Sequence, residues 1–190
     1  MINLKIDFIQ RKMNLIERKR MEKEKIEKWT KSIMNEVIFD SLIHRWDILS
    51  YDFENKATYK ENLLYLIETS DGIKFGFFIP TKITYRYYSW NERLFRVQDD
   101  EVFLFTFNDF NPRKFSMKNK YETVEILIFS SHDNRLIQIG NDDLCIYKQN
   151  YSSIINQTEK SSFDYEKNDC ALIGRVGSFT IKRIQIIKME

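Results

Sequence analysis

The stretch that decides the fold is residues 63–79, which read LLYLIETSDGIKFGFFI. Two apolar runs flank the dipeptide Asp71-Gly72, and Asp-Gly accepts the positive φ angles of a tight hairpin turn. Branched and aromatic side chains fit the pleated surface of a strand, so we predict a β-hairpin here. Gly76 predicts a close approach of another backbone. The alternation predicts three residues on one core-facing side of the second strand: Phe75, Phe77 and Ile79.

Most of the chain beyond residue 41 has the pattern of strands. The spacing of apolar residues changes there from about 3.6 to about 2. Neighbouring hairpins bury two apolar faces most simply against each other, so we expect an α+β chain that is mostly β: an antiparallel β-sandwich with flanking short helices and an N-terminal helical extension. The expected strands are residues 63–69, 73–79, 102–107, 124–130, 135–139, 143–148, 170–174 and 181–188.

The first 43 residues have the periodicity of a helix. One apolar stripe is compatible with about two heptads of a coiled coil, formed by Ile2, Ile6, Ile9, Met13 and Ile16. A second stripe has the register for packing on a body, formed by Ile26, Trp29, Ile33 and Val37. Between the stripes the chain is charged. We therefore divide the chain into a charged helical extension, residues 1–36, and a β-sandwich domain, residues 37–190.

Charge and composition limit the classes of function. The 190 residues carry 30 basic and 28 acidic side chains, a net charge of +2, which argues against nucleic-acid binding as the main activity. Residues 1–36 hold ten basic and six acidic side chains, so the basic excess lies in the extension. Two cysteines without CxxC spacing, no secretory h-region and no long apolar run predict a cytoplasmic protein without a membrane span.

Several segments resemble one known family, in order along the chain from about residue 38 to residue 190. DGIKFGFF at residues 71–78 resembles the DGxxFGxF hairpin of TLDc domains, and VFLFTF at residues 102–107 resembles their next strand. LIQIG at residues 136–140 and LCIY at residues 144–147 resemble the family's IxIG strand and its partner. Residues 162–165, 168–174 and 179–190 resemble a divergent protist branch of the family.

This resemblance implies a β-sandwich without an established catalytic centre, in proteins linked to oxidative-stress resistance and to binding of the vacuolar proton ATPase. Two positions depart from the family pattern. The family has a glycine-rich stretch where this chain has Asn141-Asp142-Asp143 after Gly140, and it favours Glu in the last strand where this chain has Gln185.

An aromatic and basic cluster at residues 85–93 is the candidate binding surface. Tyr, Trp and Arg concentrate binding energy at protein interfaces and can also stack on single-stranded bases. The small net charge favours a protein partner over nucleic acid. The alternative is a loop that folds over the sandwich with its rings half-buried. The candidate binding residues are Tyr85, Arg86, Tyr87, Tyr88, Trp90 and Arg93.

Candidates for chemistry are sparse. Cys145 and Cys170 are redox candidates, but acidic neighbours oppose the thiolate, which favours inert thiols. His44 and His132 lack metal-ligand spacing, and turn preference explains the acidic pairs, so no metal site and no cofactor are expected.

We therefore expect a non-enzymatic protein-interaction or regulatory module. The expected partners are vacuolar proton ATPase subunits, which the resemblance implies, or a second copy through the N-terminal helix. One alternative is a thiol- or carboxylate-dependent enzyme that acts on peroxide or a small substrate. A second alternative is a nucleic-acid-binding protein.

Overall fold

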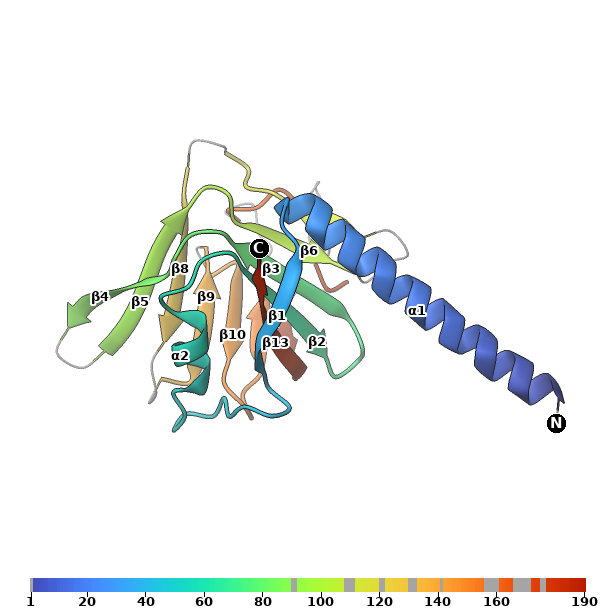
Figure 1. Cartoon of the computed structure of the whole chain (residues 1–190). Helices are drawn as coiled ribbons and strands as arrows, with labels where there is room; N and C mark the ends of the chain where they lie inside the picture. The colour runs from blue at the N-terminus through green and yellow to red at the C-terminus, as the bar shows by residue number, and fades with distance from the viewer. Residues whose placement is uncertain are drawn as a thin grey trace.

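The structure is a computed structural model of the whole chain (Figure 1). It describes residues 2–89, 92–107, 112–119, 122–129, 133–140, 142–155, 161–165, 172–174 and 177–190. Within these ranges, the side chains of residues 2–13, 85–89, 92–94 and 96 are not described.

Two antiparallel sheets form the body. The first, sheet A, has the strand order β1 (Met34–Asp40), β13 (Ile181–Met189), β2 (Leu63–Thr69), β3 (Lys74–Ile79), β6 (Phe103–Thr106) and β7 (Arg113–Phe115). The second, sheet B, has the order β12 (Gly177–Phe179), β11 (Ser153–Ile155), β10 (Leu144–Tyr147), β9 (Arg135–Ile139), β8 (Val124–Phe129), β5 (Glu92–Asp99) and β4 (Thr84–Ser89). Side chains of both sheets meet in one core, so the expected mostly-β sandwich is confirmed.

The predicted hairpin is β2 and β3, paired from Leu63 with Ile79 to Glu68 with Lys74. Its turn differs from the prediction. Within the loop, only Gly72 has a positive φ, of 86°, and its N–H donates to the Thr69 carbonyl at 3.0 Å. This is a three-residue loop in which glycine takes the left-handed position after a type I turn, so Asp71 needs no positive φ.

The two faces of β3 behave as the alternation predicts. Phe75, Phe77 and Ile79 are buried in the core between the sheets. A Cβ atom on Gly76 would lie 2.0 Å from the carbonyl oxygen of Tyr65 and 2.6 Å from the Phe105 ring. The predicted close approach of another backbone at Gly76 is therefore confirmed.

The N-terminal helix ends earlier than its apolar pattern predicts. Helix α1 spans Ile2–Thr30, and Lys31 has a φ of 56°, in the left-handed region that ends helices. The residues that follow form β1, and Ile33, expected in the helical stripe, lies just before this strand and is 66% exposed. These residues form a strand because they pair with β13, which is distant in sequence and which local spacing does not reveal. The proposed division at residues 36 and 37 lies inside this strand.

The strand predictions fail in two ways. Residues 172–174, expected in a strand, form a turn whose Leu172 and Ile173 are nevertheless buried in the core. Six strands were not predicted: β1, β4, β5, β7, β11 and β12. Of these, β7, β11 and β12 have three residues each, too few for a recognisable alternation.

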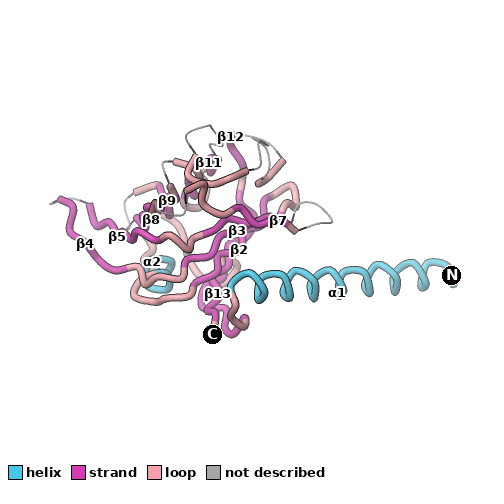
Figure 2. The backbone as a smooth tube through the Cα atoms, turned by 90° about the horizontal axis from the view of Figure 1, so that it is seen from above, coloured by secondary structure: helices cyan, strands magenta, loops and turns pink. Residues whose placement is uncertain are grey.

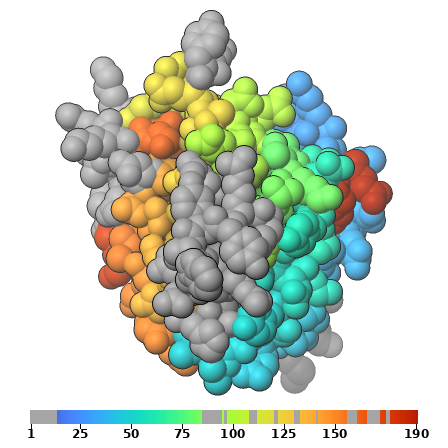
Figure 3. Space-filling model, turned by 90° about the vertical axis from the view of Figure 1, so that its left-hand side faces the viewer, coloured from blue at the N-terminus to red at the C-terminus, as the bar shows by residue number. Residues whose placement is uncertain are grey.

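The two helices in the described ranges lie at different places on the sandwich. Figure 2 shows the first half of α1 projecting away from the sandwich. Helix α2 (Asp52–Ala57) closes one end, where the ring of Phe53 packs 5.2 Å from that of Phe39. The loop before α2 meets the turn after β10, because the Gln149 N–H donates to the Trp46 carbonyl at 3.3 Å. In Figure 3, which shows the left-hand side of Figure 1, cyan and orange atoms of these two parts of the chain meet at the lower edge of the molecule.

Candidate interaction groove

The C-terminal half of α1 packs on the outer face of sheet A. The alternation that turns Phe75 and Phe77 inward turns Phe78 outward, so this face carries its own apolar patch. Trp29 lies over the patch, with its ring 6.4, 6.1 and 6.3 Å from the rings of Phe103, Phe105 and Phe107. The buried residues of this second cluster are Ile26, Leu64, Phe78, Phe103, Phe105, Phe107, Ile187 and Met189.

A polar contact fixes the middle of α1 to the sheet. The buried Glu22 carboxylate accepts hydrogen bonds from Lys74 Nζ at 3.0 Å and from Arg18 Nε at 3.1 Å. The Arg18 guanidinium also donates to the Phe107 carbonyl at 3.0 Å. Because Lys74 belongs to β3 and Phe107 follows β6, these bonds tie the helix to two places on the sheet. Glu22 and Lys74 are 52 residues apart in sequence.

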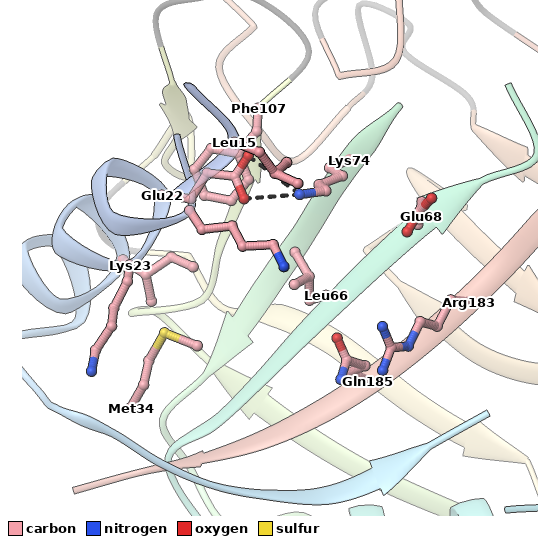
Figure 4. Close-up of a pocket in the computed structure, with 12 residues that line it drawn as sticks. Leu15, Glu22, Lys23, Met34, Leu66, Glu68, Lys74, Phe107, Arg183 and Gln185 are labelled. Atoms are coloured by element: carbon pink, nitrogen blue, oxygen red, sulfur yellow. Dashed lines mark hydrogen bonds and ion pairs between the residues drawn. The ribbon is translucent and has the colours of Figure 1, made fainter. Parts of the chain in front are cut away.

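A groove of about 390 Å³ remains between α1 and the outer face of sheet A (Figure 4). The helix forms one wall, and side chains of β1, β2, β3 and β13 form the floor and the opposite wall. The lining residues are Leu15, Lys19, Glu22, Lys23, Ile26, Met34, Leu66, Glu68, Lys74, Phe107, Arg183 and Gln185.

Paired charges line the wall of the groove that β13 provides. Arg183 donates to both carboxylate oxygens of Asp40, and this contact holds the pKa of that carboxyl below its usual value. Gln185 Nε2 also donates to Asp40, at 3.2 Å. Glu68 of β2 is paired with Lys182 at 2.6 Å. The amide of Gln185, which stands where the family resemblance implies a glutamate, is therefore a hydrogen-bond donor to a carboxylate.

We expect Gln185→Glu to destabilise the protein by roughly 1 kcal/mol at pH 7, because it replaces a donor to Asp40 by a second carboxylate. Urea unfolding at pH 7 and pH 4 measures this cost. The cost should shrink at pH 4, because protonation of the introduced carboxylate removes its repulsion from Asp40. Gln185→Leu, the uncharged control, should show a cost that changes little over this range. A glutamate variant as stable as wild type at pH 7 would contradict this account of the site.

The aromatic cluster lies on a hairpin and not on a loop that folds over the sandwich. β4 and β5 pair from Thr84 with Arg96 to Ser89 with Glu92, and β4 is the edge strand of sheet B. In Figure 1 this hairpin extends from the body on the side opposite the projecting part of α1. Trp90 lies outside the described residues. So do the side chains of Tyr85, Arg86, Tyr87, Tyr88 and Arg93.

The candidate thiol that the structure describes is buried in β10. Burial, together with the nearby Asp142 carboxylate, raises the pKa of the Cys145 thiol to about 12. Cys145 Sγ donates to Asp142 Oδ1 at 3.5 Å, which keeps the proton on sulfur at neutral pH. Cys170 lies outside the described residues.

At residues 141–143, where the family resemblance implies a glycine-rich stretch, this chain has a carboxylate with a structural role. Asp143 is fully buried, and its Oδ2 accepts the Ser162 N–H at 3.0 Å. A Cβ on Gly140 would lie 2.0 Å from this carboxylate, so the single remaining glycine leaves room for it. This contact links the turn before β10 to a segment nineteen residues further on.

Histidines and acids do not converge on a metal site in the part of the chain that the structure describes. His44 instead accepts the Asp40 N–H at Nδ1, 3.0 Å away, and stacks on the Phe39 ring. His132 lies outside the described residues. Among the described helices, none is long and apolar enough to cross a membrane.

The two packed antiparallel sheets, with a helix docked on the outer face of one of them, define a β-sandwich domain. The family model of the TLDc domain matches residues 25–190, and the chain belongs to the TLDc domain family. The resemblance predicted from the hairpin and the later strands is thereby confirmed. Comparison with curated proteins finds no match. The matched range begins inside α1 and includes Ile26 and Trp29, the residues that dock the helix.

Proposed function

We propose that this chain is a non-enzymatic protein-interaction module that binds a partner through α1 and the groove beneath it. The observation that carries the proposal is the exposure of α1 before its contact with the sheet. Every side chain described at residues 14–21 is exposed, including Leu15 at 51% and Ile16 at 60%. Exposed apolar side chains on a projecting helix are a common means of binding a groove or helix of another protein.

The charge of the helix favours a different protein as the partner over a second copy. Residues 1–36 carry a net charge of +4, so two such helices side by side would repel each other. We propose that the partner is a subunit of the vacuolar proton ATPase and that binding supports resistance to oxidative stress in the cytoplasm. Family membership supports this choice of partner. Self-association through the stripe that ends at Ile16 is the competing outcome.

We expect Ile16→Glu to weaken partner binding about tenfold, because it places a charge at an apolar contact without removing a contact to the body. The full chain is used as bait in a lysate of the source cells, and each captured protein is then purified and titrated against the variants. The control is Ile43→Glu, which makes the same change at a residue 80% exposed on the loop between β1 and α2, outside the lining of the groove.

Binding that is unchanged by Ile43→Glu and about tenfold weaker with Ile16→Glu supports the proposal. Equal binding by wild type and both variants, or no purified protein that binds, would overturn it. Capture without ATPase subunits would refute only the choice of partner. Sedimentation of the chain alone as a dimer that Ile16→Glu dissociates would replace the partner protein by a second copy.

A further inference from the structure

The groove joins an apolar floor to charged walls. Ile26 and Phe107 are buried at its base, Leu66 is half-buried, and the half-exposed Leu15 lies at its rim. In Figure 4, Leu66 and the end of Lys74 point into the space between the helix and the strands. A site of this kind can hold an apolar side chain and, beside it, groups that bind charge.

Both acidic residues that line the groove are held by cations, whereas two of its lysines are not held by strong ion pairs. Glu22 is bonded to two cations, and Glu68 is bonded to Lys182. Among the described residues, Lys19 makes no ion pair. In the described part of the chain, Lys23 pairs only with Glu27, at 3.7 Å, and the Lys23 side chain is 54% exposed. Exposed pairs at this distance are weak, so Lys19 and Lys23 are available for a ligand.

We propose that the groove binds an acidic segment of a partner protein that carries an apolar anchor side chain. This inference rests on the proposed function and names the chemistry of the segment that the groove recognises. Carboxylates of the segment face Lys19 and Lys23 on the helix wall, and the apolar anchor rests on Leu66. A basic segment would face the same lysines with like charge. The concave shape suits a peptide segment better than a flat lipid surface.

The experiment compares two charge reversals on one helix. Lys28 lies on α1 nine residues after Lys19, two and a half turns away and therefore on the opposite side, and it does not line the groove. Lys19→Glu and Lys28→Glu change the net charge equally, so any difference between them is local. The probe is a fluorescein-labelled peptide in which two Leu residues alternate with two Glu residues. The matched peptide has Lys in place of Glu.

Fluorescence anisotropy with the full chain should show that Lys19→Glu weakens the acidic peptide at least fivefold, while Lys28→Glu changes its affinity less than twofold. The peptide with Lys should bind wild type more weakly than the peptide with Glu. Thermal unfolding should place both variants close to wild type, because Lys19 is exposed and unpaired among the described residues.

Three results would overturn the inference: equal loss with both reversals, no binding of the acidic peptide, or equal binding of the two peptides. Binding of the full chain to phosphatidylserine vesicles is also measured, to test whether the groove binds a membrane instead. Vesicle binding that depends on Lys19 and exceeds peptide binding would assign the groove to membranes. If partner binding depends on Ile16 while the peptides show no preference, the proposed function stands and only this inference fails.

Discussion

Gly76→Ala is expected to destabilise the protein by about 3 kcal/mol or more, because the added methyl group collides with a backbone atom. The new Cβ would lie 2.0 Å from the Tyr65 carbonyl oxygen, a backbone atom held in the pairing of β2 with β3. Relief of this collision would require the central hairpin of sheet A to open, and the Phe105 ring, 2.6 Å from the new Cβ, would also have to move beneath Trp29. Urea unfolding of the full chain measures the cost.

Gly72→Ala is the matched control for this prediction. Gly72 has a φ of 86° but nothing within 4 Å of its added Cβ, so the substitution adds backbone strain without a collision. That strain costs about 1 kcal/mol. Gly76→Ala should therefore lower the urea midpoint clearly more than Gly72→Ala. Equal midpoints for the two variants would show that sheet A is not packed at Gly76 as described.

Trp29→Ala is expected to cost about 2–3 kcal/mol and to loosen the whole helix, because Trp29 provides the ring contacts that hold α1 to the apolar patch. Urea unfolding reports the cost, and fluorescence of a dye that binds exposed apolar surface reports the uncovering of Phe103 and Phe105. Both signals should change.

Ile16→Ala, on the exposed part of the same helix, is the control for Trp29→Ala. It removes apolar atoms that are largely open to water, so its effect should stay within about 0.5 kcal/mol and leave dye binding unchanged. A tryptophan variant with wild-type stability and no added dye binding would contradict the docking of α1.

The role of Trp29 also decides how the helix should be tested. Deletion of residues 1–36 would remove Ile26 and Trp29 together with part of β1, and would expose the outer face of sheet A to water. Loss of binding by such a truncated chain would not distinguish a missing contact from a damaged sheet. Single substitutions in the full chain, at Ile16 and Lys19, avoid this ambiguity.

Local sequence was sufficient for the parts of the fold that local contacts form. The hairpin of β2 and β3 joins neighbours in sequence, so alternation and a glycine turn predicted its pairing, its core face and the close approach at Gly76. Strand β1 pairs instead with β13, at the other end of the chain. Its residues continue a helical spacing, and only the distant partner makes them a strand.

The candidate site was less predictable for the same reason. Ile26 and Trp29 were correctly expected to pack on a body, because their spacing marks one face of a helix. Glu22 fits an ordinary ion pair one helical turn from Arg18, and nothing in that pattern points to Lys74. Gln185 departs from the pattern that the family resemblance implies, but its partner Asp40 is 145 residues away in sequence. The groove arises from long-range contacts that local periodicity does not encode.

The central claim is that the second half of α1 is docked on sheet A while the first half projects, which creates the groove and leaves exposed apolar side chains such as Ile16 for a partner. Amide hydrogen exchange of the full chain, read along α1 by mass spectrometry, tests this claim most directly. We predict slow exchange between Glu22 and Thr30 and fast exchange before Arg18, with the slow region lost in Trp29→Ala. Uniformly fast or uniformly slow exchange along α1 would contradict the account.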